Sequence, residues 1–271
     1  KLVKVQNNEA FWGNKKFAVT LGIKAAKNEY LVFTNAECYP SSSDWLLQIS
    51  SQFTKEKTIV LGYSAYEKVK NSFLNKIIRF ETMLTATQYF SWAKIGKPYM
   101  GVGRNLAYKK EAFFNVRGFM DHMKIRLGDD DLFINQAATK KNTAILYTPE
   151  SFTFSEAKTT FNSWFNQKRI QSSTVKFYKG FDRFQLGLFF FTQFWFLILA
   201  IVLLAFQFQW MLVTGLIIFR YLFTWISLGY AAGKLKEKDV MYWYPIIEIV
   251  LIFTQLRIFY KNLISKPIHW K

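Results

Sequence analysis

Residues 101–132 read GVGRNLAYKKEAFFNVRGFMDHMKIRLGDDDL, with three consecutive carboxylates before a helix-like run. Asp129, Asp130 and Asp131 repel one another, so a chain that keeps them together usually uses the group for a cation or a proton transfer. The alternative is a solvated acidic loop that caps a helix, because aspartate suits a helix N-terminus. The rest of the sequence bears on this choice.

Strand-like and helix-like segments alternate on both sides of this stretch. Apolar spacing predicts helices over 14–27, 43–53 and 72–93, and short apolar runs predict strands over 30–34, 58–63 and 143–149. In the first helix Phe17, Ala18, Leu21 and Ala25 share a face, and Lys15, Lys16, Lys24 and Lys27 lie largely off it. In the second, Trp45, Leu46, Ile49 and Phe53 point inward. The alternation predicts an α/β fold with a largely parallel sheet.

Polar residues follow the strand predicted over 30–34, where the sequence reads Asn35-Ala36-Glu37-Cys38-Tyr39-Pro40. Side chains at the carboxyl end of a parallel strand, before a helix, lie where open α/β sheets bind ligands. An ordinary connecting loop is the alternative.

Composition separates a basic part from an apolar part. The 271 residues carry a net charge of +18, and 51% are hydrophobic, with the apolar excess after residue 185. A basic domain next to an apolar region favours contact with anionic lipid on the cytoplasmic side. No nucleic-acid-binding signature accompanies the charge, so a nucleic-acid partner is not expected. The single cysteine, Cys38, excludes an intrachain disulfide and fits a reducing compartment.

The apolar region contains two candidate membrane spans. Residues 186–206 carry no charge and are long enough to cross a hydrocarbon core of about 30 Å. Residues 210–231 form a second span with Arg220 at its middle, and residues 243–260 form a third segment that either spans or is re-entrant. The link 207–209 has no lysine, whereas 233–239 has three. The positive-inside rule therefore predicts a multi-pass protein of the cell membrane with its N-terminal domain in the cytoplasm.

Arg220 needs a partner in such a span, because a charge at the middle of the bilayer costs about 2.5–3.5 kcal/mol. Glu248 is the only acid in the later hydrophobic run, so we expect the two side chains to pair. Lipid phosphate or a backbone carbonyl is the alternative. Before the spans, residues 157–185 interleave aromatic and basic side chains, which favours an interfacial helix over an ordinary amphipathic surface helix.

The order of the motifs resembles a membrane-bound family 2 glycosyltransferase of the GT-A fold, in particular the bacterial members. Residues 15–22 resemble K-x-x-A-L-N-x-G, residues 34–40 resemble T-D-A-D-C-x-P, and residues 128–130 resemble the family's T/G-E/D-D. Residues 101–108, with Gly118-Phe119 behind them, are similar to the acceptor-side segment, and residues 164–169 are similar to the Q-x-x-R-W helix. Each motif alone is weak, but five in this order before a membrane hairpin are specific.

The resemblance implies an inverting transfer of a sugar from a nucleoside diphosphate sugar to a lipid-linked or glycan acceptor near the membrane. Asp130 would be the base, and Asp129 would orient it or contact the acceptor. Glu37 would bind a divalent cation, Mg²⁺ or Mn²⁺. The donor's diphosphate would lie near Asn35, Lys15, Gln167 and Arg169, and the acceptor near Gly101, Gly103 and Arg104.

Two departures from the family pattern limit these expectations. Asn35 and Glu37 replace paired aspartates, and the neutral carbonyl of Asn35 lowers the expected metal affinity. Arg169 is one position early, which turns it by about 100° on a helix and favours a single-sugar transferase over a polymer synthase.

We therefore expect residues 1–156 to form a cytosolic GT-A-like domain and residues 186–271 a membrane region. The chain starts at Lys1 with a strand-like run over 2–5, so the family's N-terminal portion, with its base-binding acid, is expected to be missing. Two other functions remain open: a glycosyltransferase-like partner subunit without activity, and a membrane-anchored binding module.

Overall fold

The computed structural model of the chain describes residues 14–265, and these divide into two units. Unit 1 runs to Glu67 and resumes over Thr85–Ala157, and unit 2 comprises Lys68–Leu84 and the residues from Lys158 onward. Helix α3 (Phe73–Lys94) contributes its first half to unit 2 and its second half to unit 1. Each unit is described by itself.

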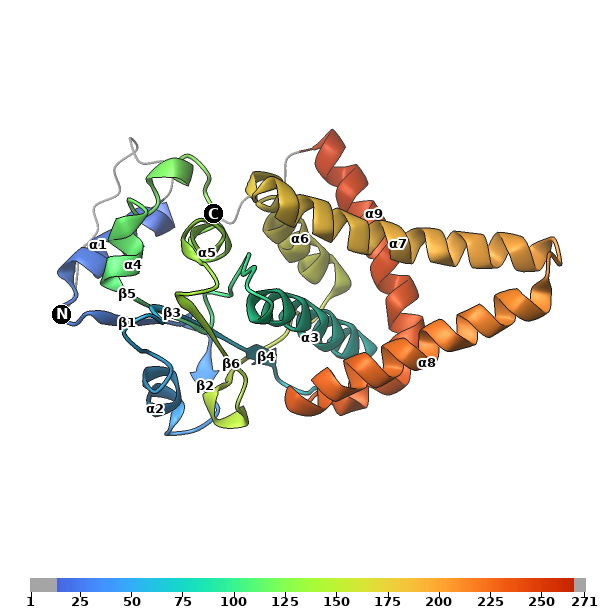
Figure 1. Cartoon of the computed structure of the whole chain (residues 1–271), viewed down its shortest axis with the longest axis horizontal. Helices are drawn as coiled ribbons and strands as arrows, with labels where there is room; N and C mark the ends of the chain where they lie inside the picture. Colours follow the sequence, from blue (N-terminus) through green and yellow to red (C-terminus); the bar gives the residue numbers. More distant parts are fainter. Residues whose placement is uncertain (1–13, 266–271) are drawn as a thin grey trace. The chain divides into compact units, whose positions relative to one another are not determined.

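Unit 1 is the mixed α/β part of the chain (Figure 1). Besides the second half of α3, its helices are α1 (Asn14–Ala25), α2 (Trp45–Ser50), α4 (Lys110–Asn115) and α5 (Asp131–Ala137), with short 3-10 turns at Met120–His122 and Pro149–Ser151. Its strands are β1 (Tyr30–Phe33), β2 (Tyr39–Pro40), β3 (Ile59–Gly62), β4 (Ser64–Tyr66), β5 (Leu106–Lys109), β6 (Thr143–Leu146) and β7 (Thr153–Ser155).

The strands form two small mixed sheets rather than one largely parallel sheet. The four-stranded sheet has the order β1-β5-β3-β6, in which β5 is antiparallel to both of its neighbours and only β3 and β6 are parallel. The three-stranded sheet has the order β2-β7-β4. The predicted α/β class is confirmed, and the predicted strand direction is wrong, because apolar runs reveal a strand but not its partners.

Strand β1 was predicted as a buried parallel strand, and this is also wrong. It pairs only with β5 among the described residues, and its side chains alternate between exposed and half-buried. Tyr30 is 55% exposed and Val32 36% exposed, although the Tyr30 ring contacts Phe53, with 4.9 Å between the ring centres. The strand-like run predicted over 2–5 lies outside the described residues.

Helix α2 and an aromatic cluster cover opposite faces of the four-stranded sheet. Ile49 of α2 packs with Val60 of β3, Ala107 of β5 and Leu146 of β6. Leu46 was predicted to point inward but is exposed. Helix α2 has only six residues, and Ile49 is its one buried residue. On the other face, Tyr108 of β5 contacts rings from α4 and α5, namely Phe113 and Phe133. Figure 1 shows α4 and α5 on this side.

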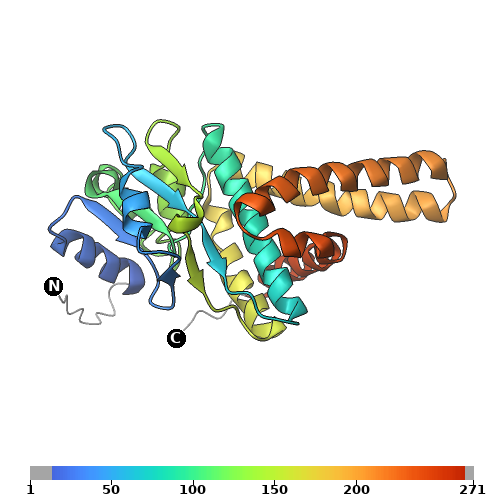
Figure 2. The same ribbon diagram turned by 90° about the horizontal axis from the view of Figure 1, so that it is seen from below.

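Unit 2 is helical. After the first half of α3 it contains α6 (Phe161–Ser172), α7 (Gly180–Ala205), α8 (Trp210–Lys234) and α9 (Tyr244–Ile264), with 3-10 turns at Val175–Phe177 and Lys238–Trp243. Helices α7 and α8 form a hairpin: they lie side by side in Figure 2, and in Figure 1 they diverge from the turn that joins them. Both are long and apolar enough to cross a membrane; none of the apolar window of α7 and 6% of that of α8 is buried in protein.

The remaining helices of unit 2 qualify two predictions. Helix α9 does not meet the same criterion for a membrane span, so the third segment stays undecided between spanning and re-entrant. In α6, Trp164 and Phe165 are buried within the unit. These two aromatic residues therefore lie against protein, whereas Phe177 and Phe184 of the same predicted segment are exposed, and the interfacial location of 157–185 stays a prediction.

The predicted pairing of Arg220 with Glu248 is confirmed. Arg220 Nη1 donates to Glu248 Oε2 at 3.1 Å, and Nη2 donates to the other carboxylate oxygen. The guanidinium also lies 4.5 Å from the centre of the Phe196 ring. The Tyr244 hydroxyl donates to Glu248 at 3.0 Å. The pair ties α8 to the first turns of α9.

Charge reversal tests the energetic weight of this pair. Arg220→Glu and Glu248→Arg should each destabilise the protein by about 3–5 kcal/mol, because each leaves two like charges in a poorly hydrated site. The double variant should recover part of that loss, and Arg257→Glu, whose exposed guanidinium lies 5.1 Å from the centre of the Phe165 ring, should cost no more than about 1 kcal/mol. Thermal unfolding in detergent measures all four variants, and a double variant no more stable than the singles would contradict the assignment.

Candidate functional site

Asp130 lies at the start of α5 and binds the loop that opens with GVGR. Its Oδ2 accepts a hydrogen bond from the Gly103 N–H at 2.7 Å, and its Oδ1 accepts from the Asp131 N–H at 2.8 Å. The residue as a whole is half-buried. The structure therefore brings together Gly103 and Asp130, two of the residues singled out by the sequence.

Glycine allows close packing where this loop meets its neighbours. A Cβ on Gly103 would lie 3.1 Å from Asp130 Oδ2, and a Cβ on Gly101 would lie 2.9 Å from Leu61 Cδ2. Gly128 adopts φ +91°, a backbone conformation that other residues rarely take. The glycines let the loop approach the carboxylate closely, and no contact of Gly101 with a substrate is implied by this packing.

The environment of Asp130 favours its protonated form. Burial, followed by the charges of Asp129 and Asp131, raises the pKa of Asp130 to about 7, against the opposing effects of the Gly103 N–H and Lys15. A carboxyl group with a pKa near neutrality can take up and release a proton under physiological conditions. This is the clearest chemical feature of unit 1.

Lys15 and Asp129 form an ion pair beside Asp130. Lys15 Nζ lies 2.8 Å from Asp129 Oδ2, and the lysine side chain is 57% exposed while the aspartate is 12% exposed. Burial lowers the pKa of Lys15, but the charge and hydrogen bond of Asp129, with smaller effects of Asp130 and Glu37, outweigh it and raise the pKa overall. Lys15 is thus the positive charge next to the carboxylate cluster, where the sequence predicted a phosphate-binding group.

The loop after β1 approaches the GVGR loop, a contact that the sequence did not predict. The Thr34 hydroxyl donates to the Arg104 carbonyl at 3.1 Å. Asn35 Nδ2 donates to Glu37 Oε1 at 3.0 Å, and Glu37 is exposed. Because the Asn35 amide is neutral, Glu37 keeps its negative charge. The Asn35 Oδ1 and the second carboxylate oxygen of Glu37 take no part in this hydrogen bond and could bind a cation.

These donors fit a particular kind of cation. Among residues 14–265, no three His, Cys, Asp or Glu side chains gather as they would to hold a metal ion. One carboxylate and one amide oxygen suit Mg²⁺ that takes its other ligands from phosphates and water, and they do not suit an ion held by protein alone. Glu37 and Asn35 are the residues that would hold such an ion.

Arg104 is largely occupied by protein. Its Nη1 donates to Ser155 Oγ at 2.9 Å, and its guanidinium lies 4.3 Å from the centre of the Tyr66 ring. Both partners belong to the three-stranded sheet. The guanidinium thus anchors the loop to that sheet, and the predicted contact of Arg104 with a substrate stays a prediction.

Asn105, the next residue, was not singled out by the sequence. It is 1% exposed, and its Nδ2 donates to the carbonyls of Tyr63 at 2.7 Å and Ser151 at 2.8 Å. Its Oδ1 accepts from Trp45 Nε1 at 3.2 Å. Three separate segments therefore meet at one carboxamide. In the sequence, the only sign of this role is a polar residue next to the apolar run of a strand.

Lys16 and His122 form a second feature that the sequence missed. Lys16 was predicted to lie off the buried face, but it is fully buried, its Nζ lies 2.8 Å from His122 Nδ1, and it donates to the His122 carbonyl. Burial lowers the pKa of Lys16 to about 8, and burial together with the lysine charge lowers the pKa of His122 to about 4. This contact holds the turn before the aspartates against α1.

Gln167 and Arg169 belong to unit 2 and are described with it. Arg169 is buried; its Nε donates to Asn262 Oδ1 at 3.1 Å, and its Nη2 donates to the Ser265 carbonyl at 3.0 Å. The guanidinium therefore binds the C-terminal end of α9, where a positive charge is favourable. Gln167 is half-buried on α6. The roles predicted for both at a diphosphate stay predictions.

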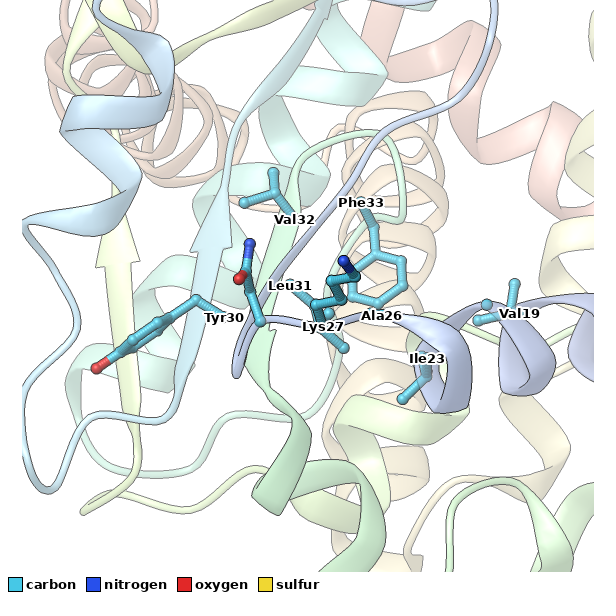
Figure 3. Close-up of a pocket in the computed structure, with 10 residues that line it drawn as sticks. Val19, Ile23, Ala26, Lys27, Tyr30, Leu31, Val32 and Phe33 are labelled. Carbon is cyan, nitrogen blue, oxygen red and sulfur yellow. The ribbon is translucent and has the colours of Figure 1, made fainter. Parts of the chain in front are cut away.

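A cavity of about 370 Å³ lies elsewhere in unit 1, between α1 and β1. Figure 3 shows Val19 and Ile23 on α1 and Tyr30 and Phe33 on β1 at its walls. The lining is mainly apolar, and none of the predicted site residues contributes to it. This cavity lies beside the edge strand β1 and is separate from the Asp130 site.

Comparison with known proteins adds no relative to this description. No family model matches the chain, and no curated protein matches it.

The raised pKa of Asp130 predicts a pH-dependent stability effect. The folded protein binds the Asp130 proton up to about pH 7 and the unfolded chain only to about pH 4, so ionisation in the folded state costs stability that grows between these values. Asp130→Asn removes this cost but loses a hydrogen-bond acceptor, worth about 1 kcal/mol at every pH. From pH 4 to pH 8 the variant should therefore gain up to about 4 kcal/mol relative to wild type.

Thermal unfolding at a series of pH values measures this gain. Asp44→Asn is the matched control, because Asp44 is exposed in unit 1 and makes no side-chain cap hydrogen bond. A constant difference between Asp130→Asn and wild type across the series would show that the carboxylate is not perturbed.

Asn105→Leu should destabilise the protein strongly. The substitution keeps an apolar volume but leaves two carbonyls and one indole N–H without their partner, at about 1–3 kcal/mol for each buried group. We expect a loss of about 3–5 kcal/mol, whereas Asn115→Leu, at an exposed position of α4, should cost less than about 1 kcal/mol. Thermal unfolding measures the stability of both variants. Equal losses would contradict the conclusion that the hydrogen bonds of Asn105 stabilise unit 1.

Proposed function

We propose that this protein is an inverting glycosyltransferase that uses a nucleoside diphosphate sugar and a hydroxyl acceptor at a membrane. The observation that carries the proposal is the half-buried Asp130 carboxylate, held by the Gly103 N–H, with its pKa raised to about 7. A general base is most effective when its pKa lies near the working pH. The motif order described from the sequence supports the same reaction.

In the proposed step, Asp130 takes the proton of the acceptor hydroxyl as its oxygen attacks the anomeric carbon. The bond from that carbon to the diphosphate oxygen breaks, and the leaving diphosphate keeps the electron pair. Attack opposite the leaving group inverts the anomeric centre. Asp129 keeps the pKa of Asp130 high and, through its ion pair, fixes Lys15 beside the site.

The departing diphosphate requires positive charge. Lys15 supplies one cation on unit 1, with its side chain largely exposed. A divalent cation would neutralise the diphosphate when bound, and Glu37 and Asn35 would hold it. Because those two residues offer few ligands, the ion should depend on the donor substrate for most of its coordination.

The membrane setting is part of the proposal. Few residues in the apolar windows of α7 and α8 are buried, and many of their large apolar side chains are exposed, which would be unfavourable in water. We place the hairpin in the cell membrane with the lysine-rich turn after α8 and unit 1 on the cytoplasmic side, as the positive-inside rule predicts. The acceptor would then be lipid-linked or lie near the membrane.

One observation favours a second candidate, an inactive glycosyltransferase-like partner subunit. Asn35 stands beside Glu37 and donates to it, so the loop has one carboxylate where the resembling family has two. Such a loop binds metal more weakly. The activity assay below separates the two candidates.

Asp130→Asn should lower turnover by about 10²–10⁴, the usual loss for a general base. In the wild type, kcat/KM should rise with pH through about 7. Asp129→Asn should move this rise to lower pH, because it removes a charge that raises the pKa of Asp130. The measurement is release of nucleoside diphosphate by the full chain in lipid vesicles, screened over nucleoside diphosphate sugars.

Asp44→Asn is again the control and should keep wild-type turnover and pH dependence. Retention of more than about a tenth of wild-type turnover by Asp130→Asn would remove the base assignment. Absence of turnover with every donor would favour the partner-subunit function.

A further inference from the structure

A second cavity, of about 330 Å³, lies wholly within unit 2. The first half of α3 and helices α7, α8 and α9 line it, so it opens among the helices at the hairpin. Phe80, Phe189 and Leu251 form part of an apolar wall. The volume falls at the small end of the range for ligand pockets, about 300–1,000 Å³, and equals the liquid volume of about ten waters.

The charges at this cavity are balanced. Arg220 and Glu248 both line it and are paired through two hydrogen bonds, and Tyr244 donates a further one to Glu248. No other acid or base belongs to the lining. A phosphate entering the cavity would meet a cation already neutralised by a carboxylate, and an ammonium group would meet the reverse. Charge complementarity therefore favours an uncharged ligand.

Two carboxamides give the cavity its free hydrogen-bonding capacity. Gln193 of α7 and Gln255 of α9 line it, and neither side chain makes a hydrogen bond to any residue within 14–265. Each carboxamide offers two N–H donors and a carbonyl acceptor. Ser227 of α8 also faces the cavity and donates to the Phe223 carbonyl, which leaves its oxygen as an acceptor. Hydroxyl groups, which both donate and accept, satisfy such a lining.

The surroundings of the cavity are apolar. Leu188 and Phe191 of α7 and Leu222 and Ile226 of α8 are each about half or more exposed, on other faces of the two helices that line the cavity. Helices α7 and α8 are long and apolar enough to cross a membrane, so a ligand that enters the cavity between them would pass through an apolar medium, as an acyl chain does. The polar lining and the apolar approach together describe an amphiphile.

We infer that this cavity binds a lipid whose head group is uncharged and carries at least one free hydroxyl. The head group lies between Gln193 and Gln255, next to the Arg220–Glu248 pair, and the acyl chains lie along the exposed surface of α7 and α8. Binding at this cavity does not rest on the proposed glycosyl transfer.

Lipid binding by the full chain tests the inference. Native mass spectrometry in detergent compares three probes with the same chains: dioleoylglycerol, its 3-O-acetyl derivative, which lacks the hydroxyl, and dioleoyl phosphatidic acid. Dioleoylglycerol should bind at least tenfold more tightly than either of the others. The variant Gln193→Leu/Gln255→Leu should lose at least tenfold of that affinity, and Gln171→Leu, at an exposed position of α6, should lose none.

Three results would overturn the inference. Tighter binding of phosphatidic acid would assign the cavity to a phosphate. Equal binding of dioleoylglycerol and its acetyl derivative would show that the protein does not recognise the hydroxyl group. Unchanged affinity in the double glutamine variant, at an unchanged unfolding temperature, would place the lipid elsewhere. None of these results depends on turnover, so the proposed transferase activity stands or falls separately.

Discussion

Three hydrogen bonds of the Asn105 carboxamide hold unit 1 together at the point where its two sheets meet. The side chain joins Tyr63, between β3 and β4, to Ser151, before β7, and accepts from Trp45 of α2. Gly62 must lack a side chain there, because a Cβ would lie 2.5 Å from Asn105 Cγ. A buried amide with all three interactions satisfied fixes these segments to one another, and the GVGR loop that precedes it inherits that fixed position.

The candidate site depends on this loop, because the Gly103 N–H reaches the Asp130 carboxylate only if the loop is held in place. The interaction also carries a cost. Asp130 is partly buried beside two other carboxylates, so its ionised form destabilises the folded chain. Lys15 and the Gly103 N–H offset part of that cost without removing it. A group kept in an unfavourable ionisation state beside an exposed lysine is typical of a site that handles protons and anions.

Unit 2 uses ion pairs for a different purpose. Arg79 of α3 is 2% exposed and binds both Glu237 and Asp239 in the turn after α8; its Nε donates to Glu237 at 2.9 Å. Further along the hairpin, Arg220 binds Glu248. The two guanidiniums connect α3, α8 and α9 where an apolar contact alone would leave the helices free to slide. Because every charge in these clusters has a partner, the helices can be packed without an isolated buried charge.

The sequence by itself determined the features that depend on local spacing and composition. The α/β class of unit 1, the apolar hairpin and the helices near residues 14–27 and 72–93 follow from periodicity, and the Arg220–Glu248 pair follows because only one acid was available to a mid-span arginine. The resemblance of the motifs assigned Asp130 and the glycine loop to the acceptor, but it did not predict the hydrogen bond between them.

Only the tertiary structure decided the features that depend on partners distant in the sequence. Strand direction was one of these. Strand β5 follows the long helix α3, lies between β1 and β3, and runs antiparallel to both. The burial of Lys16 against His122, 106 residues away, was another, because the helical pattern placed that lysine off the apolar face. Asn105 and Arg169 gained their positions from carbonyls of separate segments. The position of a residue in the sequence determines the face of its helix or strand on which the side chain lies. Which groups pack against that face depends on the tertiary fold, which brings distant segments of the chain together.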